Sequence, residues 1–495
     1  MAEHYSSKIL EKQLYEVWKT QNFNHALTTN DGQEITILDL GVFDDSLAGP
    51  DFKNARVRVG NITYVGDIEI DNSYADWKNH GHNIDAKYSK VILHVTFENK
   101  FNQHYAYTKE GRKIPTLSLN KFLNESTISE LKGTAKQPDT HETELLRCSH
   151  YCDKISVEER RNFISGLGIE RFKRKCDRIY RRLKELKYIH DLNIKEPVIQ
   201  YDLAPEFLEK HFSAEDFKDK YLWQQVLYEM VFEALGYAKN KTIMMNLAQS
   251  ADISFLTKLS SNADFVPITE AALFNIAGLV PEVKKMNDGE FSEYSKNLSK
   301  SWENISKIYD GKTFYETDWH FFKLRPQNFP TIRLAGGVRL LKSILFGNLI
   351  GTIIKKTDEI NNLNVLVNSL RSLFILRAEG YWSNHYVFDK PSNGEIKYFV
   401  GASRADEILI NVVIPFLSVY FDVFANPAMS KKVLKIYNIF QQNDDNNIVL
   451  KVAESLQMKE YLTKTIYVQG MIEVFRNYCS KNKCLECRIG KLVFS

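Results

Sequence analysis

Three carboxylates near the start of the chain have types and spacing that suit a metal ion. Asp51 follows a glycine and a proline, and Glu69 and Asp71 lie in the alternating segment GDIEID (66–71). Because side chains alternate along a strand, Asp67, Glu69 and Asp71 share one face. Three carboxylates on one face repel one another unless a cation lies among them. The pattern therefore predicts a site for a hard divalent ion, Mg²⁺ or Mn²⁺.

Histidines follow directly after these acids. His80 and His82 end the segment DWKNHGH (76–82), and His94 lies in the apolar segment 91–97. Two histidines two residues apart can bind a metal or act as a general base, or they can hydrogen-bond the backbone at a helix start. The candidate catalytic residues are Asp51, Glu69, Asp71, His80 and His82, with Asp51 and Glu69 as metal ligands.

A sheet is needed to bring these side chains together. The turn pair Gly60-Asn61 joins two strand-like segments, so Asp51 and Glu69 can reach the same end of the sheet. The order helix, three strands, helix, strand is an α/β layout. The predicted elements are a helix over 7–21, strands over 34–40, 55–59 and 62–70, a partly helical segment 76–88 and a buried strand 91–97.

The closing segment contains three cysteines in the spacing C-x4-C-x2-C, namely Cys479, Cys484 and Cys487. Tetrahedral Zn²⁺ or an iron–sulfur cluster needs a fourth ligand, which Cys148 or Cys152 can supply. Such a site would join distant parts of the chain and stabilise the fold directly. Merely buried thiols and a redox role are the alternatives.

From Val157 onward the periodicity is almost entirely helical. The run 170–186 has an apolar stripe, and its other face is rich in cations: Arg171, Lys175, Arg178 and Arg182. That face is either a solvated outer surface or a surface that follows phosphates. Arg325 and Arg333, in RPQNFPTIR (325–333), are further candidates for nucleic-acid binding, or they cap helix ends.

Length and composition indicate a multidomain protein. The 495 residues are 44% hydrophobic and 26% charged, with a net charge of +3 and six cysteines. We find no signal core and no apolar run of about 18 residues, so we expect a cytoplasmic protein without a membrane span. The predicted class is α+β: an α/β domain over 1–120, a polar linker over 121–147 and a helical region over 148–495.

The element order and the acids resemble the PD-(D/E)xK nuclease superfamily over residues ~5–100. In that superfamily, an acid after a proline-containing turn and a second acid on the next strand hold magnesium, and a lysine two residues on helps to activate water. Asp51 and Glu69 match the two acids, but Asp71 stands where the lysine is expected. Lys53, Lys78 or Lys87 could supply the charge instead.

Motifs along the whole chain resemble one bacterial family, domain of unknown function 2851 (DUF2851). They are GPDF (49–52), GDIEI (66–70) followed by HGH (80–82), LRPQNFPTIRLA (324–335), YWSNHY (381–386) and the closing KCLECRIG (483–490). That family has a histidine after the Glu-Ile pair, whereas this chain has Asp71.

These observations lead to two functional hypotheses. The first is a metal-dependent nuclease, or nucleic-acid-processing protein, that hydrolyses phosphodiester bonds in DNA or RNA. The alternative is a catalytically inactive nuclease fold that serves as a nucleic-acid-binding or protein-interaction scaffold, which Asp71 in place of a cation supports.

Overall fold

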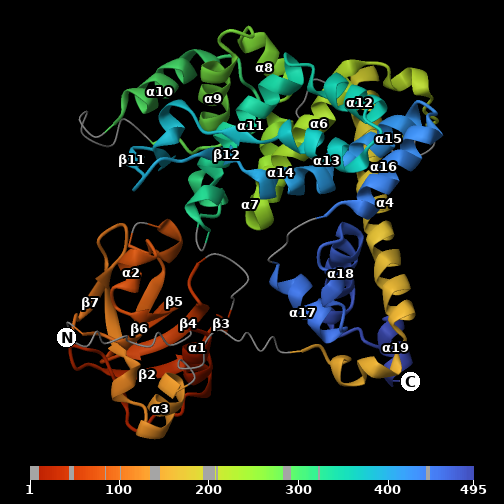
Figure 1. The fold of residues 1–495 in the computed structure, drawn as a ribbon. Helices are drawn as coiled ribbons and strands as arrows, with labels where there is room; N and C mark the ends of the chain where they lie inside the picture. The colour runs from red at the N-terminus through yellow and green to blue at the C-terminus, as the bar shows by residue number, and fades with distance from the viewer. Residues whose placement is uncertain are drawn as a thin grey trace. The chain divides into compact units, whose positions relative to one another are not determined.

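The fold is known from a computed structural model (Figure 1), which describes residues 11–43, 49–83, 85–100, 102–133, 145–192, 207, 210–281, 291–321, 324–441 and 446–494. The chain divides into two compact units, Met1–His141 and Glu142–Ser495. A curled sheet forms the first unit and the second is mostly helical, which confirms the predicted α+β class.

The sheet of the first unit is mixed. Its strands lie in the order β1-β2-β4-β5-β6-β8-β7, with β3 paired to β4. The neighbours β2, β4 and β5 are antiparallel, whereas β5, β6 and β8 are parallel. The strands are β1 (Leu27–Thr28), β2 (Glu34–Asp39), β3 (Val42–Phe43), β4 (Phe52–Val59), β5 (Ile62–Ser73), β6 (Val91–Glu98), β7 (Tyr105–Tyr107) and β8 (Lys113–Ser118).

The predicted strands and their turn are confirmed. The turn pair places Val59 opposite Ile62, and Gly60 adopts φ 56°, which a tight hairpin turn requires. Parallel strands need a crossover connection. Between β5 and β6 this connection contains α2 (Asp76–Asn79) and the 3₁₀ turn Ala86–Tyr88, the helical parts of the segment predicted over 76–88.

Helices cover both faces of the sheet (Figure 1). On one face, α1 (Glu11–Thr20) and α3 (Glu125–Gly133) pack on the main core, where Trp18 of α1 meets Ile68 and Ile70 of β5. On the other face, Trp77 of α2 forms a smaller apolar cluster with Tyr88 and Val91. The alternation along β5 therefore separates a dry core from a face that carries the acids.

The predicted linker begins too early. Residues 119–121 form a 3₁₀ turn and α3 follows, and the side chains of Phe122, Leu123 and Leu131 are buried in the core of the first unit. The residues around these three are mostly polar, so the composition of this segment is typical of a linker. The rest of the predicted linker up to residue 144 lies outside the described residues.

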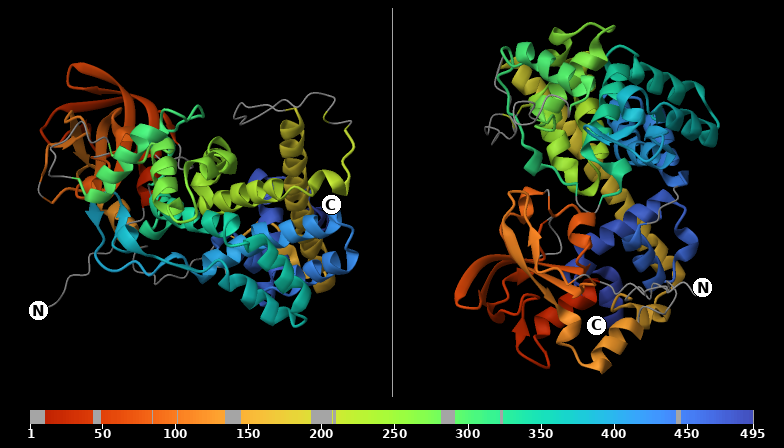
Figure 2. Two further views of the ribbon diagram at one scale, coloured as in Figure 1. Left: turned by 90° about the horizontal axis from the view of Figure 1, so that it is seen from above. Right: turned by 90° about the vertical axis from the view of Figure 1, so that its left-hand side faces the viewer.

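The second unit is organised around α4 (Val157–Asp191), the long gold helix of Figures 1 and 2. Ser156 caps its first turn through a reciprocal bond pair with Glu159. The other helices are α6 (Lys220–Leu235), α7 (Tyr237–Ser250), α8 (Ile253–Leu259), α9 (Phe265–Ile276), α10 (Glu293–Ile305), α11 (Pro330–Leu345), α12 (Leu349–Glu359), α13 (Leu363–Ser372), α14 (Ala402–Ile408), α15 (Ile414–Val423), α16 (Pro427–Ile439), α17 (Asn447–Ser455), α18 (Thr465–Asn477) and α19 (Arg488–Phe494).

Two apolar cores surround α4. The larger one joins the C-terminal half of α4 to α6, α11 and α15. The smaller one joins its N-terminal half to α17, α18 and α19 (Figure 1). Short strand pairs lie beside the larger core: β10 (His385–Val387) pairs with β11 (Lys390–Pro391), and β12 (Tyr398–Val400) pairs with β9 (Leu376–Arg377).

No single helix among the described residues is long and apolar enough to cross a bilayer. The pair α11 and α12 reaches the required length and composition only together, and it bends by 71° at its junction. The apolar segment Ile408–Phe424 is mostly buried and forms the end of α14, a π-helical turn (Leu409–Val413) and α15.

Glycines allow α4 and α18 to pack closely. A Cβ atom at Gly168 of α4 would lie 2.1 Å from the carbonyl oxygen of Ile466, and one at Gly470 of α18 would lie 1.9 Å from that of Ile164. Gly166, one half-turn away on α4, has no such neighbour within 4 Å. The close packing of the two helices therefore requires glycine at positions 168 and 470 but not at position 166.

We predict opposite effects of alanine on the two glycines of α4. Gly168→Ala forces backbones apart and lowers the free energy of unfolding of the helical unit by about 1–3 kcal/mol or more. Gly166→Ala raises it by about 0.5–1 kcal/mol, because alanine favours the helix. Guanidinium unfolding followed by circular dichroism measures both, and equal effects would contradict the close crossing.

Candidate metal centre

Strands β4 and β5 bring the two predicted acids together. Asp51 directly precedes β4, and Phe52 pairs with Ile68 of the antiparallel β5. The backbone N–H of Asp51 donates to Oε2 of Glu69 at 3.2 Å, and the N–H of Ile70 donates to Oδ2 of Asp51 at 2.9 Å. The two carboxylates therefore lie on the same side of the sheet, as the hairpin predicts.

Asp71 lies on the same face, while Ile68 and Ile70 point into the core. Asp67 shares this face but has a local role, since its Oδ1 accepts from the backbone N–H of Asn54 at 3.0 Å. Asn54 has φ 58° and lies where the pairing of β4 with β5 shifts register. Asp67 thus stabilises a bulge beside the site.

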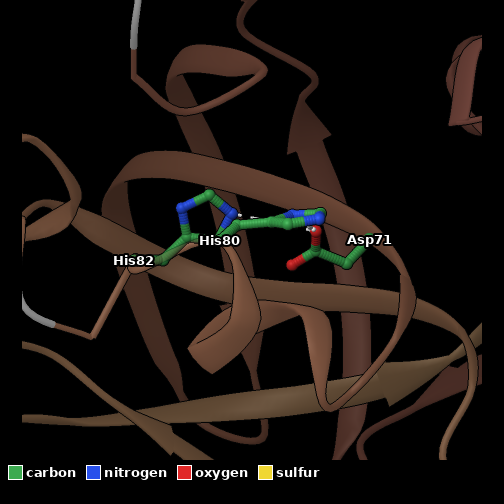
Figure 3. Close-up of side chains that lie close together, drawn as sticks. All are labelled: Asp71, His80 and His82. Atoms are coloured by element: carbon green, nitrogen blue, oxygen red, sulfur yellow. Dashed lines mark hydrogen bonds and ion pairs between the residues drawn. The ribbon is translucent and has the colours of Figure 1, made fainter. Parts of the chain in front are cut away.

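Three imidazoles surround the Asp71 carboxylate. Nδ1 of His80 lies 3.0 Å from Oδ1, Nε2 of His94 lies 3.0 Å from Oδ2, and Nε2 of His82 lies 3.8 Å from Oδ1. Nε2 of His82 also lies 3.1 Å from Oε1 of Glu69. Figure 3 shows His80 and His82 beside Asp71. Glu69 and Asp71 are thus linked through His82.

The end of α2 aims His80 and His82 at the acids. The Asp76 carboxylate accepts from the N–H and hydroxyl of Ser73 and fixes the helix start. Gly81 has φ 80°, and the N–H of His82 bonds the carbonyl of Trp77 at 3.0 Å, which closes the helix end. The chain reverses at the glycine, so both histidines face the strand acids.

Aromatic rings cover the histidines. The Trp77 ring lies 4.9 Å from the ring of His94 and 5.4 Å from that of His82, and the Tyr88 ring lies 4.1 Å from that of His82. His82 and His94 are fully buried, whereas 28% of the His80 side chain is exposed. His80 therefore lies at the solvent side of the cluster.

Burial and charge divide the acids into two electrostatic classes. Burial, together with the neighbouring Asp51 carboxylate, raises the pKa of Glu69 well above its usual range. Burial also opposes ionisation of Asp71, but hydrogen bonds from His80, His82 and His94 outweigh it and hold its pKa well below the usual range. Asp71 is the permanently charged member of the cluster.

The neighbouring acids raise the pKa values of the imidazoles of His80 and His82. The hydrogen bond with Asp71 raises the pKa of His80. Burial lowers the pKa of His82, but its bonds with Asp71 and Glu69 outweigh this and raise it to about 9. Positive charge next to the strand acids is therefore supplied by imidazole.

Asp71, His80 and His82 form a geometric trio for a metal ion. One nitrogen from each histidine and one oxygen of Asp71 lie within 4.8 Å of one another. Donors around one ion at 2.0–2.2 Å are at most about 4.4 Å apart, so small side-chain adjustments suffice. The sequence predicts Asp51 and Glu69 as ligands, with Asp71 as a possible third; Asp71 belongs to this trio, and Asp51 and Glu69 lie next to it.

The predicted cationic stripe of α4 is bonded within the helical unit. Arg171 donates to Gln469 and Glu473 of α18, and Arg178 pairs with Glu233 of α6. Arg182 pairs with the buried Glu229 of α6 at 2.8 Å. Arg171 and Arg182 are largely enclosed in helix–helix contacts, whereas 52% of the Arg178 side chain stays exposed beside its pairing with Glu233.

Lys175 and Arg333 also lie inside the helical unit. Lys175 donates to Asn411 at 2.7 Å and to Gln469 at 2.9 Å, and burial holds its pKa well below the usual range. Arg333 donates to the carbonyl of Phe399 at 2.7 Å, and burial lowers its pKa to about 9. Arg325 is exposed at the start of a 3₁₀ turn, Pro326–Asn328.

The predicted cysteines gather at the smaller core of the helical unit. Cys152 and Cys487 are buried there, and Cys148 and Cys479 pack against it. Sγ of Cys152 accepts from the Arg160 guanidinium at 3.0 Å. Cys152 therefore already has a cationic partner.

His94 is the site residue that the sequence analysis did not assign. It pairs with Glu69 in the parallel register of β5 and β6, which places its ring beside the acids. The available signal is a lone imidazole inside an otherwise apolar strand. Tyr15 of α1, whose phenol hydrogen-bonds Asp51, has no comparable signal because its helix reads as an ordinary amphipathic one.

We predict that His82 stabilises the metal-free protein in a pH-dependent way. A pKa of about 9 against the ordinary 6.5 means that protonated His82 stabilises the fold fully below pH 6.5. This contribution, about 3 kcal/mol at most, is lost as the pH rises through 9.

After dialysis against a chelator, His82→Asn should unfold earlier than wild type at pH 6.5, and the difference should close towards pH 9.5. Thermal unfolding across this range measures it. Exposed His25 provides the control, since His25→Asn should show no such trend. A difference that stays constant across the range would mean that buried His82 is neutral.

Comparison with known proteins supports one assignment. The family described as "Protein of unknown function (DUF2851)" matches residues 11–193 and 209–447. No curated protein and no solved structure matches the chain. The match covers most of the chain, including the whole carboxylate–histidine site and the motifs up to YWSNHY (381–386), whereas the closing KCLECRIG (483–490) lies beyond it. The chain belongs to the DUF2851 family.

Proposed function

We propose that the first unit is a metal-dependent phosphodiesterase acting on DNA or RNA, with its ion held by Asp71, His80 and His82. The observation that carries this proposal is the Asp71 carboxylate, which lies 3.0 Å from nitrogens of both His80 and His94 in a buried site. A carboxylate so placed needs positive charge, and two histidines with one carboxylate are a common ligand set for catalytic metals.

The donor set bears on the identity of the ion. Imidazole nitrogen suits transition metals, whereas Mg²⁺ prefers oxygen ligands and retains its water. Of the two ions expected from the sequence, Mn²⁺ therefore suits this trio better than Mg²⁺. Glu69 bonds Nε2 of His82, the nitrogen that also faces Asp71, so it orients this imidazole in the metal-free protein and is a further candidate ligand for the ion.

The arrangement of elements favours phosphodiester chemistry. Antiparallel β2, β4 and β5, then α2 and the parallel β6, follow the order of the nuclease superfamily that the sequence resembles. Asp51, directly before β4, lies beside Glu69 of β5, and this pair supports the comparison with the two acids of that superfamily. At the lysine position stands Asp71, and the imidazoles around it supply the positive charge in the metal-free protein, which the bound ion would replace.

Each residue has a distinct role in this proposal. A divalent ion held by Asp71, His80 and His82 would supply Lewis-acid chemistry, polarising a phosphate oxygen and activating a water molecule. His94 fixes Asp71 through Oδ2, while Asp51 fixes the backbone of β5 through Ile70. His80, the most exposed ring of the cluster, would hold the ion at its solvent side.

The first test is metal binding to the chelator-treated full chain. Wild type should bind one Mn²⁺ per chain, and Asp71→Asn or His80→Ala should weaken the binding by roughly 100-fold or more. His25→Ala, which removes an exposed histidine of the same unit, should bind like wild type. Isothermal titration calorimetry measures the affinities, and unchanged binding by both site variants would refute the ligand assignment.

The second test is cleavage of labelled single- and double-stranded DNA and RNA with Mn²⁺ or Mg²⁺. Glu69→Gln should lower the rate by roughly 100-fold or more, because His82 loses its orienting carboxylate. Glu98→Gln at the end of β6, whose side chain is 45% exposed, is the matched control. If wild type and Glu69→Gln cleave equally, the activity comes from a contaminant.

The rival proposal is an inactive nuclease fold that binds nucleic acid or protein as a scaffold. One observation favours it, namely that the strand acids are already neutralised by imidazoles instead of standing beside a lysine. Binding of labelled DNA or RNA without cleavage, weakening steeply as salt rises, would support the nucleic-acid form. If the protein neither binds nor cleaves DNA or RNA, a protein-interaction scaffold is the remaining form of this proposal.

A further inference from the structure

Four thiols from separate parts of the chain meet at one end of the helical unit. Cys148 directly precedes the 3₁₀ turn Ser149–Lys154, and Cys479 begins the turn Cys479–Lys481 after α18. Cys484 and Cys487 lie in the turn before α19. The Tyr151 ring packs 5.9 Å from that of Phe494, so the first of these segments lies against α19. More than 300 residues separate Cys148 from the other three.

The turn before α19 has the geometry of a thiolate-binding loop. The N–H of Cys487 bonds the carbonyl of Cys484 at 3.1 Å, and the N–H groups of Ile489 and Gly490 point at the Cys487 thiol. A Cβ atom at Gly490 would lie 1.9 Å from the carbonyl oxygen of Cys484, so only glycine fits. Backbone donors aimed at a sulfur stabilise its ionised form.

Charge interactions among the thiols show their proximity. Burial and then the neighbouring Cys487 thiol raise the pKa of Cys148 to about 11. Burial and then the Cys148 thiol raise the pKa of Cys479 to about 12. Cys484 acts on both, and Cys152 also acts on Cys148. Geometry agrees with this, because Cys148, Cys479 and Cys487 belong to the same apolar core and the N–H of Cys487 bonds the carbonyl of Cys484.

The remaining two cysteines are excluded by their contacts. The Arg160 guanidinium donates to Sγ of Cys152 and to the carbonyl of Leu456, the latter at 2.6 Å. These bonds hold the Cys152 side chain in the protein interior. Sγ of Cys176 faces the carbonyl of Pro415 at 3.8 Å in the larger core. Both cysteines therefore serve as internal controls.

We propose that Cys148, Cys479, Cys484 and Cys487 hold an iron–sulfur cluster. A single zinc ion at 2.3 Å from each sulfur needs thiols about 3.8 Å apart. Yet no three of these thiols lie within 4.8 Å of one another, since Asp71, His80 and His82 form the one such trio among the described residues. A polynuclear cluster spaces its four cysteines more widely, so it does not require three thiols within that distance.

Binding the cluster replaces four thiol protons with bonds to iron. It would join the segment before α4 to the segment after α18 and complete the smaller core. Its part is structural, because the carboxylate–histidine site belongs to the other unit. This inference does not depend on the proposed nuclease activity.

The test is to purify the full chain without oxygen and to measure iron, sulfide, zinc and the visible spectrum. Wild type should be brown, with iron and sulfide in equal amounts and little zinc. Cys484→Ser should lose most of the iron or change the spectrum, while Cys152→Ala and Cys176→Ala should keep both. Because Cys484→Ser replaces a half-buried thiol with a similar hydroxyl, circular dichroism should show that the fold persists.

Two results would overturn the inference. If the wild-type protein is colourless and contains one zinc ion per chain, the iron–sulfur cluster is excluded, and only the assignment of the four cysteine ligands remains. Iron content that is unaffected by Cys484→Ser and by Cys148→Ser, or that is lost in Cys152→Ala, excludes the ligand set. Cleavage assays are not needed for either conclusion.

Discussion

The candidate site depends on one buried negative charge. Asp71 is almost completely enclosed, and a lone carboxylate in such a place costs several kcal/mol of solvation. His80, His82 and His94 compensate this charge, and each of them is placed by a different constraint: the helix end, the glycine turn and the register of β6. Strands β5 and β6 and helix α2 must therefore all be in place before the carboxylate is stable.

Much of the first unit could be predicted because its constraints are local. Alternation in GDIEID and the turn pair Gly60-Asn61 determine which face carries the acids and how β4 meets β5. Glu69 and Asp71 are therefore found where expected. The cluster around them could not be predicted, since His94 reaches the acids only through parallel pairing across a crossover. Spacing along the chain contains no signal of that pairing.

In the helical unit, the helices could be predicted from the sequence, but the contacts of their polar faces could not. Periodicity identified the apolar stripe of α4, and residues such as Phe172, Ile179 and Leu183 are buried accordingly. Periodicity does not reveal what a polar face meets, so Arg171 and Arg182 looked like a surface but bond acids on neighbouring helices. Likewise the polar run that began the predicted linker contains the helix α3, because three buried apolar residues outweigh its composition.

The position of α4 between two cores has a consequence for synthesis on the ribosome. Its C-terminal half can pack on α6 soon after both emerge, but its N-terminal half needs α17, α18 and α19, which are made nearly 300 residues later. At about 5–20 residues per second, that half waits on the order of 15–60 s with its apolar stripe exposed. During this interval the nascent chain offers a binding surface for chaperones that the finished protein has buried.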